Sequence, residues 1–242
     1  MIIVYFSVNL DILRLLLSLK NTKMRLNEIE IKTADIQPVK NFYANILELP
    51  TTQVNNKSIR IKIGTSYLKF IEDVKNPSPA YHLAFNIPKN KLQEAINWSI
   101  NKVRFVKKEK EVLITNFENW NANSVYFYDI DGNILEFIAR HDLDNTATEQ
   151  FNSSQILNIS EFGIVKDRPD IYGKYLIDTY GFHLFEKNHN SETFTALGDD
   201  NGLLIIVKTN RNWYPTETPS KASWATIKLT NSGIETIVKT TA

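Results

Sequence analysis

The sequence contains no cysteine. Disulfides, thiolate catalysis and cysteine-ligated metals are therefore excluded, and the absence suits a reducing compartment, so we expect a cytoplasmic protein. An excess of charge is also missing, because 28 Lys and Arg stand against 27 Asp and Glu, for a net charge of +1. This balance gives no electrostatic reason to expect nucleic acid or an anionic membrane as a partner. We expect a small-molecule substrate instead.

Long hydrophobic runs are absent as well. The N-terminal residues are apolar, but Asp11 and Arg14 interrupt them, and no run reaches the roughly 18 apolar residues that a membrane span requires. A basic start and a small-residue cleavage site, which are typical of secretion signals, are missing too. We therefore interpret residues 1–24 as an N-terminal extension, either a short helix packed on the domain or a segment upstream of a start at Met24.

The clearest local signal is a β-hairpin within residues 124–140. Two β-rich runs flank Asp131-Gly132-Asn133, and glycine supplies the positive φ that such turns need. In the second strand, alternation places the carboxylate of Glu136 on a mostly apolar strand, and residues 81–86 alternate in the same way with His82 on one face. An imidazole and a carboxylate on separate strands of one sheet can converge on a single point.

One structural module recurs along the chain. Residues 25–71 read as a strand, a helix with Asp35 as its N-cap, and three further strands. The same order returns at 81–138 and again at 156–208, where a helix over 169–180 ends at Gly181. A fourth copy begins with a strand at 224–229 and a short helical tail. The pattern predicts a βαβββ module of roughly 50 to 60 residues, present about three and a half times.

The fold class that follows is α+β. A single module covers one face of its sheet with a helix and leaves the other face open, so two modules must pair to enclose a cavity. We predict that the repeated βαβββ modules pair into a cupped, half-barrel mixed sheet with the helices outside. The expected domains are the paired modules at 25–140, a polar linker at 141–154, and a third module with a partial fourth at 155–242.

The modules resemble the vicinal oxygen chelate superfamily of glyoxalase I, bleomycin-resistance proteins and extradiol ring-cleaving dioxygenases. The resemblance is carried by a helix and two strand regions: Phe42-Tyr43 with Ile46-Leu47-Glu48-Leu49, Tyr81-His82-Leu83-Ala84-Phe85, and Asp131-Gly132-Asn133-Ile134-Leu135-Glu136. Ile130 stands where the family usually has proline. The resemblance is firm over residues 25–140 and looser over 156–242.

Metal ligands of that superfamily lie on the first and last strands of each paired module. Carried over residue by residue, the first-strand positions fall on Glu28 and His82, and the last-strand positions on Lys69 and Glu136. The resemblance thus implies a metal site made of Glu28, His82 and Glu136. Two carboxylates and one imidazole suit divalent Fe, Mn, Ni or Zn. Such an ion can bind two adjacent oxygens of a substrate.

Lys69 opposes this interpretation. An ammonium about 5 Å from a divalent ion is repelled by roughly 6–7 kcal/mol at an effective dielectric constant near 20, unless the side chain turns away or loses its proton. Together with Glu136, Lys69 and Glu30 are the candidate catalytic groups, as an acid, a base or an oxyanion partner. The alternative is a wet cup without metal, in which the basic residues of these strands pair with the glutamates.

We predict a substrate pocket lined by basic and aromatic residues, namely Arg60, Lys62, Trp120, Tyr126 and Tyr128. Glu161 occupies the first-strand ligand position of the third module, but Leu204 or Ile205 and Ala225 stand where its partners would be. We therefore interpret the third module as a packing or lid unit. The long loop 209–221, which contains Trp213, is a candidate to fold over an edge or an opening.

These residues are consistent with three functions from different classes. The first is a metal-dependent enzyme of the glyoxalase or extradiol dioxygenase type, a lyase, isomerase or ring-cleaving dioxygenase that acts on a small oxygenated substrate. The second is a metal-free small-molecule-binding protein of the bleomycin-resistance type, and the third is a scaffold with a decayed site. The chain has enough modules to complete a cup alone, so we expect a monomer, with a homodimer as the alternative.

Overall fold

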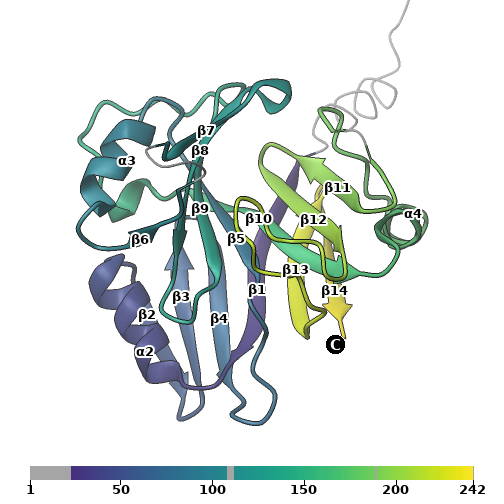
Figure 1. Cartoon of the computed structure of the whole chain (residues 1–242), viewed down its shortest axis with the longest axis horizontal. Helices are drawn as coiled ribbons and strands as arrows, with labels where there is room; N and C mark the ends of the chain where they lie inside the picture. The colour runs from purple at the N-terminus through teal and green to yellow at the C-terminus, as the bar shows by residue number, and fades with distance from the viewer. Residues whose placement is uncertain (1–22, 108–111, 189, 242) are drawn as a thin grey trace, which may run out of the picture.

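A computed structural model describes residues 23–107, 112–188 and 190–241 (Figure 1). Nearly all of the predicted N-terminal extension, as well as His189, lies outside these ranges. The described part is α+β and consists of two mixed sheets that are not closed into a barrel, with helices packed on them. Figure 1 shows α2 and α3 on one side of the molecule and α4 on the other.

The first sheet contains β1 (Met24–Thr33), β2 (Thr51–Asn55), β3 (Ser58–Ile63), β4 (Ser66–Glu72), β13 (Ala225–Asn231) and β14 (Ile234–Thr240). The second contains β5 (His82–Ile87), β6 (Arg104–Phe105), β8 (Ala122–Tyr128), β9 (Ile134–Arg140), β10 (Asn158–Lys166), β11 (Phe194–Asp199) and β12 (Gly202–Lys208), with β7 (Ile114–Phe117) paired to β8. The helices are α2 (Ile36–Asn41), α3 (Leu92–Ser99) and α4 (Pro169–Tyr180), with a π-helical turn η1 (Phe42–Ile46) and the 3-10 turns η2 (Glu118–Trp120) and η3 (Ser153–Gln155). No helix in the described ranges is long and apolar enough to cross a membrane.

Local signals in the sequence explain where these elements begin and end. Asp35 caps α2, because its carboxylate accepts a hydrogen bond from the backbone N–H of Gln37 at 2.8 Å. Helix α4 ends at Gly181 with a φ of +67°, a left-handed conformation that favours glycine. The hairpin between β8 and β9 turns at Gly132 with a φ of +83°, as predicted. These three element boundaries are therefore set by short-range chemistry.

The modules do not pair in chain order. The first sheet has the strand order β14-β13-β1-β4-β3-β2, and the second has β11-β12-β10-β5-β9-β8-β6. The first module therefore joins the fourth, across antiparallel β1 and β13, while the second joins the third, across antiparallel β5 and β10. The expected cup from consecutive modules at 25–140 is wrong in this respect. The fourth module is also not a strand with a helical tail but a hairpin of β13 and β14.

A shared core explains which faces of the sheets remain open. One continuous cluster of buried apolar residues takes side chains from both sheets and from all three α-helices, including Ile29 of β1, Leu83 of β5 and Phe162 of β10. Alternation along a strand sends neighbouring residues to the opposite face. Glu28 on one sheet and His82 on the other consequently point away from this shared core, and each belongs to the open face of its own sheet.

Candidate metal and substrate site

Three strands of the second sheet bring acidic and imidazole side chains to one face. His82 begins β5, which pairs with β9 on one side and with β10 on the other. Glu136 of β9 and Glu161 of β10 are both opposite Ala84 in the strand register. Register partners point to the same face of a sheet, and so do residues two apart. The small side chain of Ala84 thus lies between two carboxylates, next to the imidazole.

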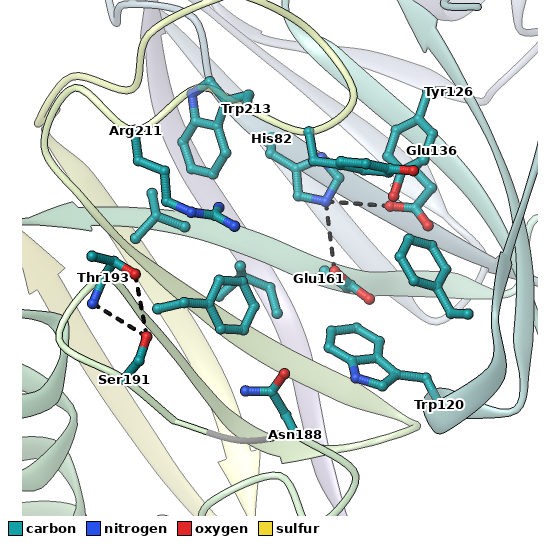
Figure 2. A pocket seen from close by; sticks show the side chains of 15 residues that line it. His82, Trp120, Tyr126, Glu136, Glu161, Asn188, Ser191, Thr193, Arg211 and Trp213 are labelled. Carbon is teal, nitrogen blue, oxygen red and sulfur yellow. Dashed lines mark hydrogen bonds and ion pairs between the residues drawn. The ribbon is translucent and has the colours of Figure 1, made fainter. Parts of the chain in front are cut away.

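The three side chains converge at close range (Figure 2). Nε2 of His82 lies 3.3 Å from Oε2 of Glu136 and 3.5 Å from Oε2 of Glu161. One ligand atom from each of the three residues lies within 4.8 Å of the others. The exposed fractions of His82, Glu136 and Glu161 are 7%, 1% and 3%. This is a buried cluster, and not a solvated acidic patch.

The backbone fixes the orientation of the His82 ring. Nδ1 lies 3.2 Å from the carbonyl oxygen of Ile134, so it donates a hydrogen bond there and leaves Nε2 to face the carboxylates. Burial by itself would lower the pKa of His82, but hydrogen bonds and charges from Glu136 and Glu161 outweigh it and raise the pKa from 6.5 to about 9. In the metal-free protein at neutral pH, Nε2 therefore holds a proton between the two carboxylates.

A fully buried arginine stands behind Glu161. Arg140, the last residue of β9, donates from Nη2 to Glu161, from Nη1 to Asp200 at 3.2 Å, and from Nε to the Ser160 hydroxyl at 3.2 Å. Asp200 also binds Lys187, at 2.6 Å. Burial would raise the pKa of Glu161, but the hydrogen bond to His82 and the charge of Arg140 lower it. Glu161 is thus held ionised and in a fixed orientation.

Glu136 has no such cation behind it. Burial raises its pKa, and the charge of Glu161 adds to this effect, against the hydrogen bond with His82. Its second oxygen, Oε1, is buried and has no hydrogen-bond partner among the described residues. Buried polar atoms are usually paired, so this oxygen is available to a bound group.

These residues fit a divalent metal ion. Two carboxylates and an imidazole supply three oxygen and nitrogen donors, and the unpaired Oε1 of Glu136 adds acceptor capacity. The register also identifies a fourth position. His82 pairs with Ile134, and Glu136 follows Ile134 by two residues on β9. Glu161 pairs with Leu203, and Ile205 follows Leu203 by two residues on β12. Ile205 therefore stands to Glu161 as Glu136 stands to His82. Because isoleucine has no donor atom, the described residues offer three ligands at this site, as sites that also bind a substrate do.

The cluster lines a pocket of about 460 Å³, a size typical of small-molecule sites. Its walls are largely aromatic and include Phe117, Trp120, Tyr126, Trp213 and Tyr214. Residues of the loop 209–221 thus form part of the pocket wall. Trp213 is anchored by its Nε1, which donates to the carbonyl of Ala80 at 3.1 Å, and its ring centroid lies 6.0 Å from that of His82.

Glu28, which the resemblance had grouped with His82 and Glu136, lies in the other sheet. Its two oxygens accept from Arg60 and Lys228, each at 2.6 Å. These ion pairs and hydrogen bonds lower the pKa of Glu28 against the raising effect of burial. The expected convergence of Glu28 with His82 is wrong, because the first module pairs with the fourth. Arg60 and Lys228 thus neutralise the charge of Glu28.

The other predicted residues divide between the two sheets. Lys69 binds Glu30 at 2.5 Å, and both belong to the first sheet together with Arg60 and Lys62 of β3, so none of these four lines the pocket. Trp120 and Tyr126 do line it. Tyr128 does not; it stacks under Arg104, with 4.2 Å from the guanidinium carbon to the ring centroid.

Sequence reasoning missed Glu161, Arg140 and Arg211 as residues of this site. Glu161 occupies a first-strand ligand position, but the third and fourth modules offer it no partners, and the sequence does not show that its partners lie in the second module. Arg140 ends the same strand that carries Glu136, but an arginine at a strand end usually faces solvent. Arg211 comes from a loop, which has no alternation to indicate where its side chains point.

Comparisons with known proteins agree with this fold. No family model and no curated protein matches the sequence. Among solved structures, the chain is similar to a suggested dioxygenase from Bacillus subtilis, with 15% identity over 90% of this chain and 70% of that one and a TM-score of 0.57. It is also similar to a variant of glyoxalase I from Zea mays, with 13% identity over 85% and 74% of the two chains and a TM-score of 0.53. The chain therefore has the fold of the vicinal oxygen chelate superfamily, as its modules implied.

Proposed function

We propose that this protein is a divalent-metal-dependent enzyme of the glyoxalase or extradiol dioxygenase type, and that His82, Glu136 and Glu161 hold the ion. The observation that carries the proposal is the buried convergence of these three side chains from three strands, within 4.8 Å of one another. Relatives of the same fold include a glyoxalase I and a suggested dioxygenase, which supports this class of chemistry. Fe, Mn, Ni and Zn all accept such donors.

Each residue has a distinct role in this proposal. A bound ion would supply Lewis acidity to two neighbouring oxygens of the substrate. His82 is held by its Nδ1 contact, and Arg140 holds Glu161 in place. Glu136 combines a raised pKa with a free Oε1, so it is the carboxylate that accepts a proton from the substrate. The aromatic walls keep water away from the reacting atoms.

A metal-free binding protein is the second candidate, and the charges of the cluster favour it. Without an ion, protonated His82 and Arg140 together balance the two carboxylates of Glu136 and Glu161. The cluster is thus stable as an ion-pair network, and its pocket would then simply bind a small molecule. The two candidates differ in whether a metal displaces the proton from Nε2 of His82.

We also propose a cytoplasmic, monomeric protein. The lack of cysteine suits a reducing compartment, and the sheet that carries the site is built from the second and third modules of one chain.

Metal analysis of protein purified without a histidine tag tests the proposal. We expect about one equivalent of Fe, Mn, Ni or Zn per chain, removable with a chelator and restored by titration. Glu136→Gln and Glu161→Gln each remove a charged ligand, so the affinity for Mn(II) in calorimetry should fall by at least about 100-fold. Glu28→Gln is the matched control, because it changes another buried strand glutamate, in the other sheet.

The outcomes separate the candidates. Loss of the metal in the two site variants with retention in Glu28→Gln supports the enzyme. A wild-type protein that binds none of the four ions, at any pH from 6 to 9, would falsify the metal site and leave the binding protein. Equal loss in Glu28→Gln would mean that the substitutions act through stability, which thermal melts of all three variants measure directly.

A further inference from the structure

Arg211 and Arg140 both lie near the site, but they differ in their interaction partners. It is half-buried, lines the same pocket as His82, and comes from the loop that follows β12. Its guanidinium lies 5.2 Å from the centroid of the Phe194 ring. Arg140 has Glu161, Asp200 and Ser160 as partners, whereas the Arg211 side chain has no ion pair or hydrogen bond within the described ranges.

The Arg211 guanidinium is partly removed from water and has no carboxylate partner among the described residues. Burial lowers the pKa of Arg211 below its ordinary value, and no acidic group opposes that effect. A desolvated, unpaired charge destabilises a fold. Such a group is retained where a ligand completes its interactions, and a guanidinium is built for the two oxygens of a carboxylate.

Further hydrogen-bond donors line the pocket. The Nδ2 of Asn188 is buried and has no partner among the described residues. The hydroxyl oxygens of Ser191 and Thr193 lie 3.2 Å apart. Figure 2 shows Arg211, Ser191 and Thr193 on one side of the pocket. Glu136, Tyr126 and Trp120 lie on the other, so the pocket has a basic end and an acidic end.

The space between the two ends is apolar. Phe117, Trp120, Tyr126 and Tyr214 form one part of the wall, and Phe194 and Val207 form another. Aromatic walls of this kind accept a flat or aliphatic body by stacking and by apolar contact. A ligand that fills the pocket therefore has an apolar body and one anionic group.

We propose that Arg211, with Asn188 and Ser191, binds the carboxylate of the substrate, which is thus an organic acid with an apolar body whose other, oxygenated end reaches His82, Glu136 and Glu161. The contact at the reacting end rests on the proposed function, but the carboxylate contact does not. One guanidinium matches a single negative charge, so a carboxylate fits better than the doubly charged phosphate of a phosphate ester.

Binding of simple probes to chelator-treated protein tests this. The probes are phenylacetate, 3-phenylpropanoate and 4-phenylbutanoate, each beside its neutral amide, with phenyl phosphate as the competing anion. Quenching of tryptophan fluorescence reports binding, since Trp120 and Trp213 line the pocket. A charge-assisted hydrogen bond is worth about 1.5–3 kcal/mol, so we expect at least one acid to bind about 10- to 100-fold more tightly than its amide.

Variants assign the preference to Arg211. Arg211→Gln should abolish the difference between acid and amide, and Arg211→Lys should keep part of it. Arg168→Gln is the matched control, because Arg168 pairs with Asp170 on the surface, and it should bind like the wild type. The melting temperature of Arg211→Gln should be unchanged or higher, because the substitution removes an unpaired, partly buried charge.

Four results would overturn the inference. These are equal binding of every acid and its amide, no binding of any acid up to about 20 mM, a preference that survives Arg211→Gln, or tighter binding of phenyl phosphate than of all three acids. Because metal is absent throughout, the carboxylate preference can hold even if the metal site proves wrong. Conversely, the glutamate variants can lose metal binding even if the protein shows no preference for a carboxylate.

Discussion

Replacing Arg140 with methionine should destabilise the protein strongly. The arginine is fully buried and holds Glu161 and Asp200, and removal of one partner from a buried ion pair costs about 3–5 kcal/mol. Asp200 retains Lys187 at 2.6 Å, and Glu161 retains His82 at 3.5 Å. The loss should therefore lie near the lower limit, about 3 kcal/mol, which corresponds to a fall in melting temperature of roughly 6–12 °C for a chain of this size.

Thermal and urea denaturation of the metal-free protein measure this loss. Arg60→Met is the matched control, because Arg60 also pairs with a glutamate, Glu28, but its side chain is 40% exposed. The Arg60 guanidinium is largely solvated, and Glu28 would keep Lys228 at 2.6 Å, so this variant should lose much less, about 1 kcal/mol.

A double variant tests the cause. If the destabilisation comes from an uncompensated charge on Glu161, adding Glu161→Gln to Arg140→Met should recover about 1–3 kcal/mol relative to the sum of the single effects. A coupling energy near zero, or a loss in Arg140→Met no larger than in Arg60→Met, would refute the reasoning.

Two further predictions concern the site. Because Glu136 and Glu161 raise the pKa of His82 to about 9, a proton occupies Nε2 below that pH, and Mn(II) affinity should rise by about tenfold per pH unit from 6 to 8; a flat profile in calorimetry would contradict this protonation. Gly163→Ala should displace Trp213, since a Cβ at Gly163 would lie 2.5 Å from its ring. We expect a loss of about 1–3 kcal/mol and a red-shifted tryptophan emission, and an unchanged spectrum would show that the ring does not move.

Much of the local structure could be predicted from the sequence. Alternation correctly predicted that His82 and Leu83 point to opposite faces of the sheet and that Glu136 lies on the open face. The side chains of His82 and Glu136 do meet. The reason is that side-chain direction in a strand depends only on neighbouring residues. The hairpin at Gly132 and the end of α4 at Gly181 follow from backbone conformations that glycine favours, and these signals are equally local.

The third acidic residue could not be predicted in this way. Each module begins with a strand whose backbone can pair with the first strand of any other module, so the periodicity does not determine which two modules join. One signal in the sequence favoured the observed pairing. Lys69 stands at a ligand position of the first module, where it would repel a metal ion, whereas Glu161 of the third module would attract one.

The nested order of the modules affects how the chain assembles. β1 pairs with β13, so that Glu28 contacts Lys228 across a separation of 200 residues, whereas the second and third modules adjoin in the chain. During synthesis, the sheet that carries the pocket can therefore close while β1 still lacks its neighbour. Contacts of such long range slow folding, so we expect the pairing of β13 with β1 to come late, and the unpaired edge of β1 to be open to self-association before it.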